Sequence, residues 1–264
     1  MPYFFRPVRS DMYSFVRFAF SIFIVATPIA AMAQQKPATV LYSNYVKAKD
    51  GMRREYEDAA KRHLEWHRKN KDQWPINVWE IISGERTGQY SYGIGHRQWH
   101  DFDTRGDLEQ SDMADYYATA DKFIDFLKVS YYMYMPELSR SAPAGAMPPL
   151  MEVMRYRVKM DRIGEFLDAN AKIKVAIEKS GAPLYCDVYQ LFSGGEHPTY
   201  LFRIPRKNFA DLDPPDPSMM AMLEKAYGHE EGQAVMNRLM GSVESVESEL
   251  MAARPDMSYT PEAK

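Results

Sequence analysis

The sequence predicts an α+β fold of two tandem ferredoxin-like units, each ordered β-α-β-β-α, with antiparallel sheets packed face to face as an α+β barrel. Three observations support this prediction. Residues 40–103 and 150–213 share a faint pattern at a constant offset of 110 residues. Each copy carries apolar stripes at helical spacing and glycine-centred hairpins. Helices on one face of each sheet leave an apolar sheet face that the other copy can cover.

The repeat is the first of these observations, because self-similarity at a fixed period outranks any single motif in assigning a fold. The aligned pairs include Lys49 with Lys159, Glu55 with Glu165, Val78 with Val188, Gly84 with Gly194 and Tyr90 with Tyr200. Residues 136–139 match residues 255–258 at an offset of 119, which indicates about nine inserted residues in the second copy. The predicted organisation is one unit over 34–140, a proline-rich linker over 141–149, a second unit over 150–259 and a disordered tail over 260–264.

Residues 1–33 read as an export signal that is removed from the mature chain. Arg6, Arg9 and Arg17 give a positive start, residues 18–32 are mostly apolar, and Ala31 and Ala33 form a small-x-small cleavage site. An uncleaved anchor is the alternative, but an apolar run of about 15 residues is shorter than the roughly 20 that span a bilayer. We therefore expect an exported protein, periplasmic or secreted, without a membrane span after cleavage.

Composition excludes some classes of protein. With 264 residues, of which 45% are hydrophobic, the chain can bury a substantial core. A net charge of -3 without a basic excess gives no indication of a nucleic acid partner. The single cysteine, Cys186, rules out an intramolecular disulfide and is predicted to be a small buried hydrophobe.

In the first copy, residues 40–48 read as a strand and Asp50 as the cap of a helix. The apolar stripe of that helix comprises Met52, Tyr56, Ala59, His63 and His67. Strands at 76–83 and 89–94 form a hairpin with apolar residues on both faces, which indicates a sheet covered on both sides. A second helix, capped by Ser111, continues its stripe as far as Tyr134.

The second copy repeats this order. Residues 151–158 are a predicted strand, and the following helix has a buried stripe of Ile163, Phe166, Ala169, Ile173 and Ile177. Strands at 184–192 and 199–204 follow. Ser218 is the predicted cap of a methionine-rich helix that Gly228 ends, and the last helix is expected to run as far as Leu250. A fourth strand is not placed in either copy.

This pattern resembles the dimeric α+β barrel superfamily, in which two ferredoxin-like units press their sheets together. The residues that carry the resemblance are Tyr156-Arg157-Val158-Lys159, Gly194-Gly195-Glu196, Ile204-Pro205-Arg206-Lys207 and Arg254-Pro255-Asp256-Met257-Ser258-Tyr259. They look like a group of exported, duplicated bacterial proteins of unassigned function. The superfamily includes cofactor-free monooxygenases of electron-rich aromatics and haem enzymes such as chlorite dismutases, but the sequence carries no catalytic signature of these, and fold kinship is a weak guide to chemistry.

Two histidines are the main candidates for a site. His63 and His67 hold stripe positions that Ile173 and Ile177 hold in the second copy, and residues four apart share one face of a helix. This spacing suits a shared metal ion, but spacing identifies no third ligand, so no metal is predicted. Lining a ligand cleft and simple packing are the other interpretations of the pair.

The other candidate site residues lie on the predicted strands. Trp79 and Tyr92 would complete a cleft with the two histidines, and Glu80 interrupts a mostly apolar face. Arg155 and Arg203 are mid-strand charges, which must be paired if they are buried. They would either join the two sheets through acids such as Asp187 or line a pocket for an anionic ligand.

Three further histidines carry less weight. His96 and His100 follow the first hairpin and are expected on a surface connection. His229 opens the last helix and is the one residue considered as an axial haem ligand.

The sequence therefore favours an exported protein that binds a small hydrophobic or aromatic molecule. The alternative is a cofactor-free or haem-dependent oxidoreductase of the same fold, and a purely structural subunit is a third reading. No cofactor is predicted, and haem is considered only under the oxidoreductase alternative. The partners considered are a small-molecule ligand and a second copy of the chain.

Overall fold

The computed structural model describes residues 39–262. The predicted signal peptide at 1–33 lies outside them, as do residues 34–38 of the first predicted unit and residues 263–264 of the predicted tail. The described chain contains eight strands and six α-helices in a mixed α+β fold, and its strands close into one antiparallel barrel. The predicted fold class is confirmed.

The first half of the described chain contributes four strands. Its elements are β1 (Val40–Ala48), α1 (Arg53–Lys69), β2 (Asn77–Ser83), β3 (Tyr90–Arg97), α2 (Trp99–Asp103), α3 (Gly106–Thr119), a 3-10 turn (Asp121–Phe123) and β4 (Ile124–Tyr134).

The second half contributes the other four strands. Its elements are β5 (Leu150–Val158), α4 (Ile163–Ser180), β6 (Asp187–Ser193), β7 (Thr199–Arg206), α5 (Met219–Tyr227), α6 (His229–Ser242) and β8 (Val243–Ala253). Short 3-10 turns lie at Met160–Arg162, Phe209–Leu212 and Pro255–Met257.

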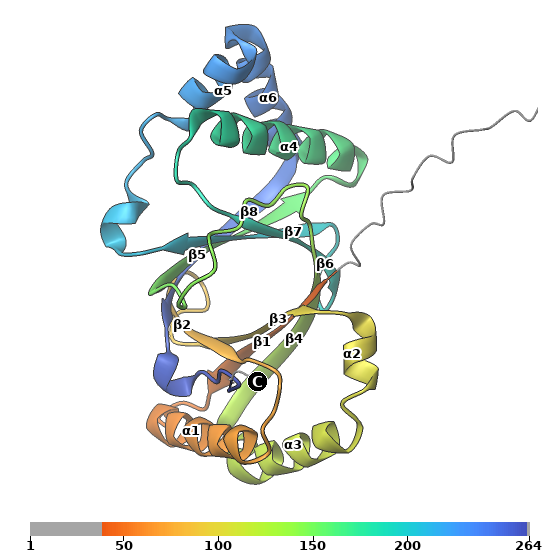
Figure 1. The fold of residues 1–264 in the computed structure, drawn as a ribbon, viewed down its shortest axis with the longest axis vertical. Coiled ribbons are helices and arrows are strands. Elements are labelled where there is room, and N and C mark those ends of the chain that lie inside the picture. The colour runs from red at the N-terminus through yellow and green to blue at the C-terminus, as the bar shows by residue number, and fades with distance from the viewer. Residues whose placement is uncertain (1–38, 263–264) are drawn as a thin grey trace, which may run out of the picture. The chain divides into compact units, whose positions relative to one another are not determined.

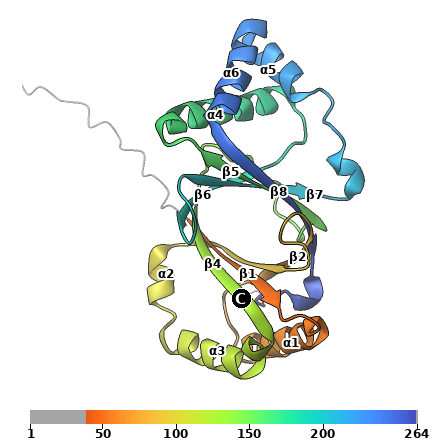
Figure 2. The ribbon, with the colours of Figure 1, turned by 180° about the vertical axis from the view of Figure 1, so that it is seen from behind.

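The strand order around the barrel is β1-β3-β2-β8-β5-β7-β6-β4, and β4 pairs with β1 to close it. The two halves therefore join at two seams, where β2 pairs with β8 and β4 pairs with β6. In Figures 1 and 2 the helices α1 and α3 cover one side of the barrel, and α4, α5 and α6 cover the opposite side. Full closure leaves no sheet edge without a partner strand.

The strands carry apolar residues on both faces, as expected. Trp79 and Ile81 of β2 point into the barrel, where they pack with Leu41, Val153 and Leu201. Val78, the residue before Trp79, packs on the helix side in a cluster with Tyr56, Tyr90 and Met257. Alternate residues of β2 therefore serve two cores, because successive side chains of a strand point to opposite faces.

The prediction of one long second helix per half is wrong. α3 ends at Thr119, and residues 124–134 form β4. In the second half α6 ends at Ser242, and residues 243–253 form β8. Each half therefore has the order β-α-β-β-α-α-β. The physical reason is that β4 and β8 pair along their lengths with β1 and β5 and supply the seam edges.

Helix ends were predicted with mixed success. Neither Asp50 nor Ser111 is a cap, because α1 follows Met52 without a side-chain cap and α3 begins at Gly106. Ser218 does cap α5, since its hydroxyl accepts a hydrogen bond from Ala221 N at 3.2 Å, and Gly228 ends that helix. In residues 39–262, no helix is long and apolar enough to cross a membrane.

The segment after the last strand of each half packs on the other half. Ser258 Oγ accepts from Val78 N at 2.9 Å and donates to Arg254 O at 2.8 Å. Ser139 Oγ accepts from Val188 N at 2.8 Å and donates to Met135 O at 2.7 Å. The two strand residues, Val78 and Val188, are 110 positions apart, and the two serines, Ser139 and Ser258, are 119 positions apart, which are the offsets of the sequence repeat. The two terminal segments, here called the crossovers, therefore make matching contacts with the opposite half.

Candidate functional site

A cavity of about 330 Å³ lies between the helices α1 and α3 and the outer face of the first-half sheet. It is at the lower end of the roughly 300–1,000 Å³ typical of small-molecule pockets. Seven aromatic residues line it: Tyr42, Tyr56, Trp74, Tyr92, Phe102, Tyr116 and Tyr131. The wall also contains two histidines and three residues with a basic or acidic side chain: His63, His67, Arg105, Glu109 and Asp112. The cavity therefore combines an aromatic wall with a charged region.

The corresponding region of the second half is filled. Ile173 and Ile177, which match His63 and His67, pack in an apolar cluster with Met222 and Leu223 of α5. α5 packs against both α4 and α6. In the first half, α2 lies instead at the side of the barrel, away from α1 (Figure 1). The histidines thus occur in the half whose helix layer lacks a helix like α5.

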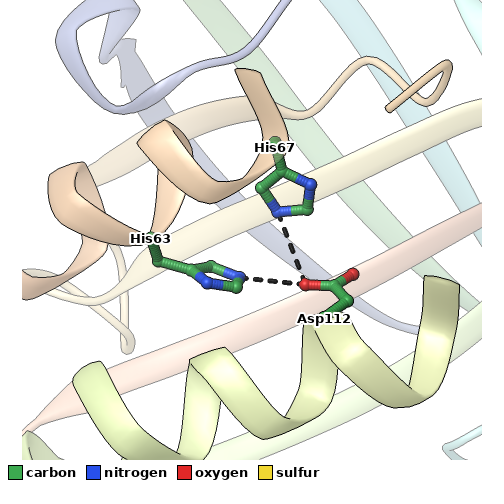
Figure 3. Close-up of side chains that lie close together, drawn as sticks. All are labelled: His63, His67 and Asp112. Carbon is green, nitrogen blue, oxygen red and sulfur yellow. Dashed lines mark ion pairs between the residues drawn. The ribbon is translucent and has the colours of Figure 1, made fainter. Parts of the chain in front are cut away.

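The two histidines and Asp112 converge. His63 and His67 project from α1 toward Asp112 on α3 (Figure 3). His63 Nε2 lies 3.1 Å from Asp112 Oδ1, and His67 Nε2 lies 3.6 Å from the same oxygen. The donor atoms of the three residues all lie within 4.8 Å of one another. The His63 side chain is 13% exposed and the His67 side chain 2%.

Carboxylates hold the other nitrogen of each ring. His63 Nδ1 lies 2.7 Å from Asp115 Oδ2, and His67 Nδ1 lies 2.8 Å from Asp72 Oδ2. Asp72 is fixed in turn, because its Oδ1 accepts a hydrogen bond from Trp74 N at 3.0 Å. Both imidazoles therefore have a set orientation, with Nε2 directed at Asp112.

Arg105 contacts two of these carboxylates. Its Nη2 donates to Asp72 Oδ2 at 2.9 Å and to Asp112 Oδ2 at 3.0 Å, so Asp112 Oδ1 is the oxygen that faces the histidines. The guanidinium also lies over the Trp74 ring, 4.4 Å from its centroid. Arg105 is 7% exposed at its side chain, and it fixes both carboxylates.

The charges shift two ionisation equilibria. Burial alone would lower the pKa of His63, but hydrogen bonds to Asp112 and Asp115 outweigh it and raise that pKa above its ordinary value. Burial alone would raise the pKa of Asp72, but its hydrogen bond with His67 and the charge of Arg105 lower it. Asp72 is therefore an anion at neutral pH, next to an imidazole that it orients.

The aromatic wall supplies neutral phenols. The hydroxyls of Tyr56 and Tyr92 lie 2.6 Å apart. Burial raises the pKa of Tyr42, Tyr56, Tyr92 and Tyr116 above the usual phenol range, so each keeps its proton at neutral pH. Such a wall can stack on a planar molecule and can also hydrogen-bond to it.

One buried polar atom of the cavity wall, the acceptor Asn44 Oδ1, lacks a hydrogen-bond partner in the described chain. Arg105 Nε lies 3.1 Å from Glu109 Oε2, so it has an ion-pair partner. Buried polar groups are usually satisfied, so an unpaired acceptor in a cavity wall indicates a place for a hydrogen-bond donor of a bound molecule.

The C-terminal segment supports this site from the side. The Tyr259 ring stacks on His67 with centroids 5.7 Å apart, and its hydroxyl donates to Asp72 O at 2.8 Å. Ile76, in the cavity wall, pairs with Tyr259 through backbone hydrogen bonds. Residues near the end of the chain therefore hold His67 and the turn that carries Asp72.

The structure brings three of the predicted site residues together, namely His63, His67 and Tyr92. The expectation that Trp79 shares their cleft is corrected, because Trp79 points into the barrel interior on the opposite face of the sheet. Arg203 lies over the Trp79 ring at 4.9 Å and does not line the cavity.

Glu80 and Arg155 also lie elsewhere. Glu80 belongs to an ionic network at the N-terminal end of α1. It accepts hydrogen bonds from Arg53 Nη2 at 2.6 Å and from Arg254 Nη1 at 3.2 Å. Arg155 is buried inside the barrel and pairs with Glu249 at 3.1 Å. Of the two expected roles for Arg155, the contacts fit a joint between strands, and its acidic partner is Glu249 instead of Asp187.

The remaining histidines and the cysteine lie away from the cavity wall. His100 is exposed and 3.1 Å from Asp101, and His96 packs edge-on against Tyr134. His229 is exposed, with Nδ1 2.6 Å from Glu224 Oε1, so it gives no support to a haem site. Cys186 is partly buried, and burial raises the pKa of its thiol to about 12.

Sequence reasoning missed the carboxylates. Asp112 and Asp115 lie three residues apart, next to Tyr116, so one helical face carries all three toward α1. That spacing was a usable signal. The apolar stripe predicted for this region passes through Met113 and continues into residues that form β4, and it therefore obscures this face.

No family model matches this sequence, and no curated protein matches it. Solved structures do match in fold. The chain is similar to a candidate monooxygenase from Lactobacillus acidophilus NCFM, with 14% identity and a TM-score of 0.56 over 86% of this chain and 98% of that chain. It is similar to an anthrone oxidase-like protein, with 11% identity and a TM-score of 0.53 over 87% of this chain and 96% of that chain.

A third similar structure is a chlorite dismutase variant from Candidatus Nitrospira defluvii in complex with cyanide. Its identity is 8% and its TM-score 0.51, over 83% of this chain and 92% of that chain. The three similarities show that this chain has the dimeric α+β barrel fold. At these identities they show the fold alone.

Proposed function

We propose that the protein is exported and binds a small aromatic molecule in the cavity between α1 and α3. The observation that supports this most directly is the cavity wall, which combines seven aromatic side chains with one buried acceptor, Asn44 Oδ1, that has no hydrogen-bond partner in the described chain. Export rests on residues 1–33 of the sequence, and the descent of the two halves from one duplicated unit rests on their matching contacts. A homodimer stays a prediction, which light scattering of the purified protein would test.

The expected ligand has a planar apolar body and a polar group at one end. The rings around the cavity favour the planar body through stacking. One end of the cavity is formed by His63, Arg105 and Asp112. This end favours a ligand group that both donates and accepts hydrogen bonds, because it offers basic and acidic side chains together. A long aliphatic chain fits less well, since the cavity volume is only about 330 Å³.

Native mass spectrometry of freshly purified mature protein tests this function. The wild-type protein is expected to carry a retained small molecule. Ala60→Leu fills the cavity from α1 without altering a charged group, and it should abolish retention. A matched control is Ala176→Leu on α4, a buried position outside the cavity wall. If Ala60→Leu folds and retains the same molecule as wild type, the cavity is not the binding site.

The double variant His63→Ile, His67→Ile is a second test, because isoleucine is the residue of the second half at both positions. It should release the ligand while the chain stays folded. Unchanged retention in this variant would remove the histidines from the binding site.

An oxidoreductase that acts on the bound aromatic molecule is the second candidate function. The specific observation in its favour is the convergence of His63, His67 and Asp112 at the cavity wall. Oxygen consumption with phenolic substrates, lost in Asp112→Asn, would support it. Binding of the same phenols without turnover would leave the binding function alone.

A further inference from the structure

His63, His67 and Asp112 have the composition of a metal site with open positions. Two imidazoles and one carboxylate bind non-haem iron(II), and the same set binds catalytic zinc(II), with the other positions free for water or substrate. Ligands at about 2.1 Å from one ion lie roughly 3–3.5 Å apart when adjacent. Asp112 Oδ1 is 3.1 Å and 3.6 Å from the two Nε2 atoms, so both histidine–carboxylate separations are close to this range.

The surrounding groups are those that orient metal ligands. A histidine that binds a metal through one nitrogen usually donates the other N–H to a carboxylate, which sets the tautomer and the ring orientation. Asp115 does this for His63 at 2.7 Å, and Asp72 does it for His67 at 2.8 Å.

The local charge favours a cation. Asp72, Asp112, Asp115 and Glu109 surround the histidines and Arg105. Of these four carboxylates, Asp72 and Asp112 are largely buried, whereas the side chains of Asp115 and Glu109 are 29% and 50% exposed. A divalent cation between the histidines and Asp112 would add positive charge to this acidic group. Arg105 binds the outer oxygen of Asp112 and leaves Oδ1 directed at the histidines.

The three residues also line the aromatic cavity, so an ion between them would present its open positions to whatever the cavity holds. The second half offers the contrast. There the two histidine positions are Ile173 and Ile177, and the space is occupied by Met222 and Leu223. The two histidines and the cavity therefore occur together in the first half, whereas the second half has isoleucines and a packed apolar cluster in their place.

We propose that His63 Nε2, His67 Nε2 and Asp112 Oδ1 bind one divalent first-row transition metal ion, iron(II) or zinc(II), whose open positions face the cavity. The cavity ligand is then an aromatic molecule with an oxygen donor, such as a phenol or an aromatic carboxylate, that coordinates the ion. The statement about the ligand rests on the proposed binding function, whereas the metal site does not.

Titration of tag-free, chelator-treated mature protein with zinc(II) and cobalt(II) in a calorimeter tests the metal site. One equivalent should bind. Asp112→Asn, His63→Ile and His67→Ile should each weaken binding at least about 100-fold, because each removes one ligand. Asp115→Asn should weaken it roughly 10- to 100-fold through the orientation of His63. His100→Ala and His229→Ala, which remove exposed histidines outside the cavity wall, should leave binding unchanged.

The ligands can also be counted without any variant. Copper(II) bound to the wild-type protein should show two imidazoles by pulsed electron paramagnetic resonance. This readout remains if a variant fails to fold. Absence of saturable binding, a count of zero imidazoles, or unchanged affinity in all three ligand variants would overturn the proposal.

The two proposals fail in different ways. Ala60→Leu should lose the aromatic ligand and keep one equivalent of metal. If wild type binds metal but retains no aromatic molecule, and phenols leave the cobalt(II) spectrum unchanged, the metal site stands and the binding function fails. If an aromatic molecule is retained by a protein that binds no metal, the reverse holds.

Discussion

Arg155 Nη2 donates a hydrogen bond to the Tyr45 hydroxyl at 2.6 Å, and the two residues are separated by 110 positions. The offset that aligns the two halves therefore brings two corresponding positions together inside the barrel. Glu249, 3% exposed at its side chain, accepts from both Arg155 and Arg86, and Arg86 lies over the Tyr45 ring at 3.8 Å. This buried group links strands of both halves.

Arg155→Met should destabilise the protein by about 2–4 kcal/mol, because it removes one partner from a buried ion pair and leaves Tyr45 without its donor. Glu249 keeps Arg86, which limits the loss. Urea denaturation at pH 7 measures the change. A double-mutant cycle with Glu249→Gln should show a coupling of about 1–3 kcal/mol, and simple additivity would contradict the described contact.

Gly194→Ala should cost about 2–4 kcal/mol. Gly194 has φ of +95°, and an added Cβ would meet Val129 O and lie 2.7 Å from Ser130 Cα at the seam between β4 and β6. Gly88→Ala is the matched control, since its φ is +87° but its Cβ would meet nothing within 4 Å. Its cost should be about 1 kcal/mol. Equal melting temperatures for the two variants would contradict the close approach at this seam.

Ser139→Ala and Ser258→Ala should each cost about 1–2 kcal/mol. Each change leaves one buried backbone N–H, of Val188 or Val78, without its acceptor. The two serines bind strands of different halves and share no partner, so the free-energy loss of the double variant should equal the sum of the two single losses. Denaturant titration of the four proteins tests this, and a large departure from additivity would show that the crossovers do not act separately.

Glu57 predicts a pH dependence of stability. Hydrogen bonds from Arg254 lower the pKa of Glu57 to about 2 against the opposing effect of burial, and Tyr90 also donates to this carboxylate. A carboxylate with a lowered pKa stabilises the fold above its unfolded-state pKa of 4.5, and this contribution is lost as the pH falls through 4.5 toward 2.

Wild-type protein should therefore lose on the order of 1–2 kcal/mol more than Glu57→Gln between about pH 5 and pH 2, with solvent screening reducing the effect. Denaturation curves at several pH values measure it. Glu55→Gln, an exposed change on the same helix, should follow the wild-type curve. A Glu57→Gln curve parallel to wild type would contradict the assignment.

The fold class could be predicted because it depends on patterns that are local in sequence. The alternation of Val78, Trp79 and Ile81 marks a strand with two buried faces, and the α1 stripe marks a helix. The fourth strands could not be placed, because Ile124, Leu127, Tyr131 and Tyr134 fit a helical period as well as they fit a β-rich run. Long-range pairing with β1 and β6 decides between the two.

Part of the site could be predicted from the sequence, and part could not, for a similar reason. His63 and His67 could be singled out, because the second half has isoleucine at both positions. Asp72 follows α1, whereas Arg105 and Asp112 belong to α3 and the residue before it, and their meeting depends on how α3 is rotated against α1. Trp79 was assigned to the wrong face because both faces of β2 carry large apolar residues, Val78 and Ile82 on one and Trp79 and Ile81 on the other, which leaves the inward face undetermined.

The contact of Tyr259 with His67 has a consequence for biosynthesis. A ribosome synthesises α1 well before it reaches Tyr259. The His67 imidazole therefore has no stacking partner until most of the barrel that follows α1 has been made. The amino-terminal half, if severed, would retain both histidines but would lack the aromatic ring that steadies one of them.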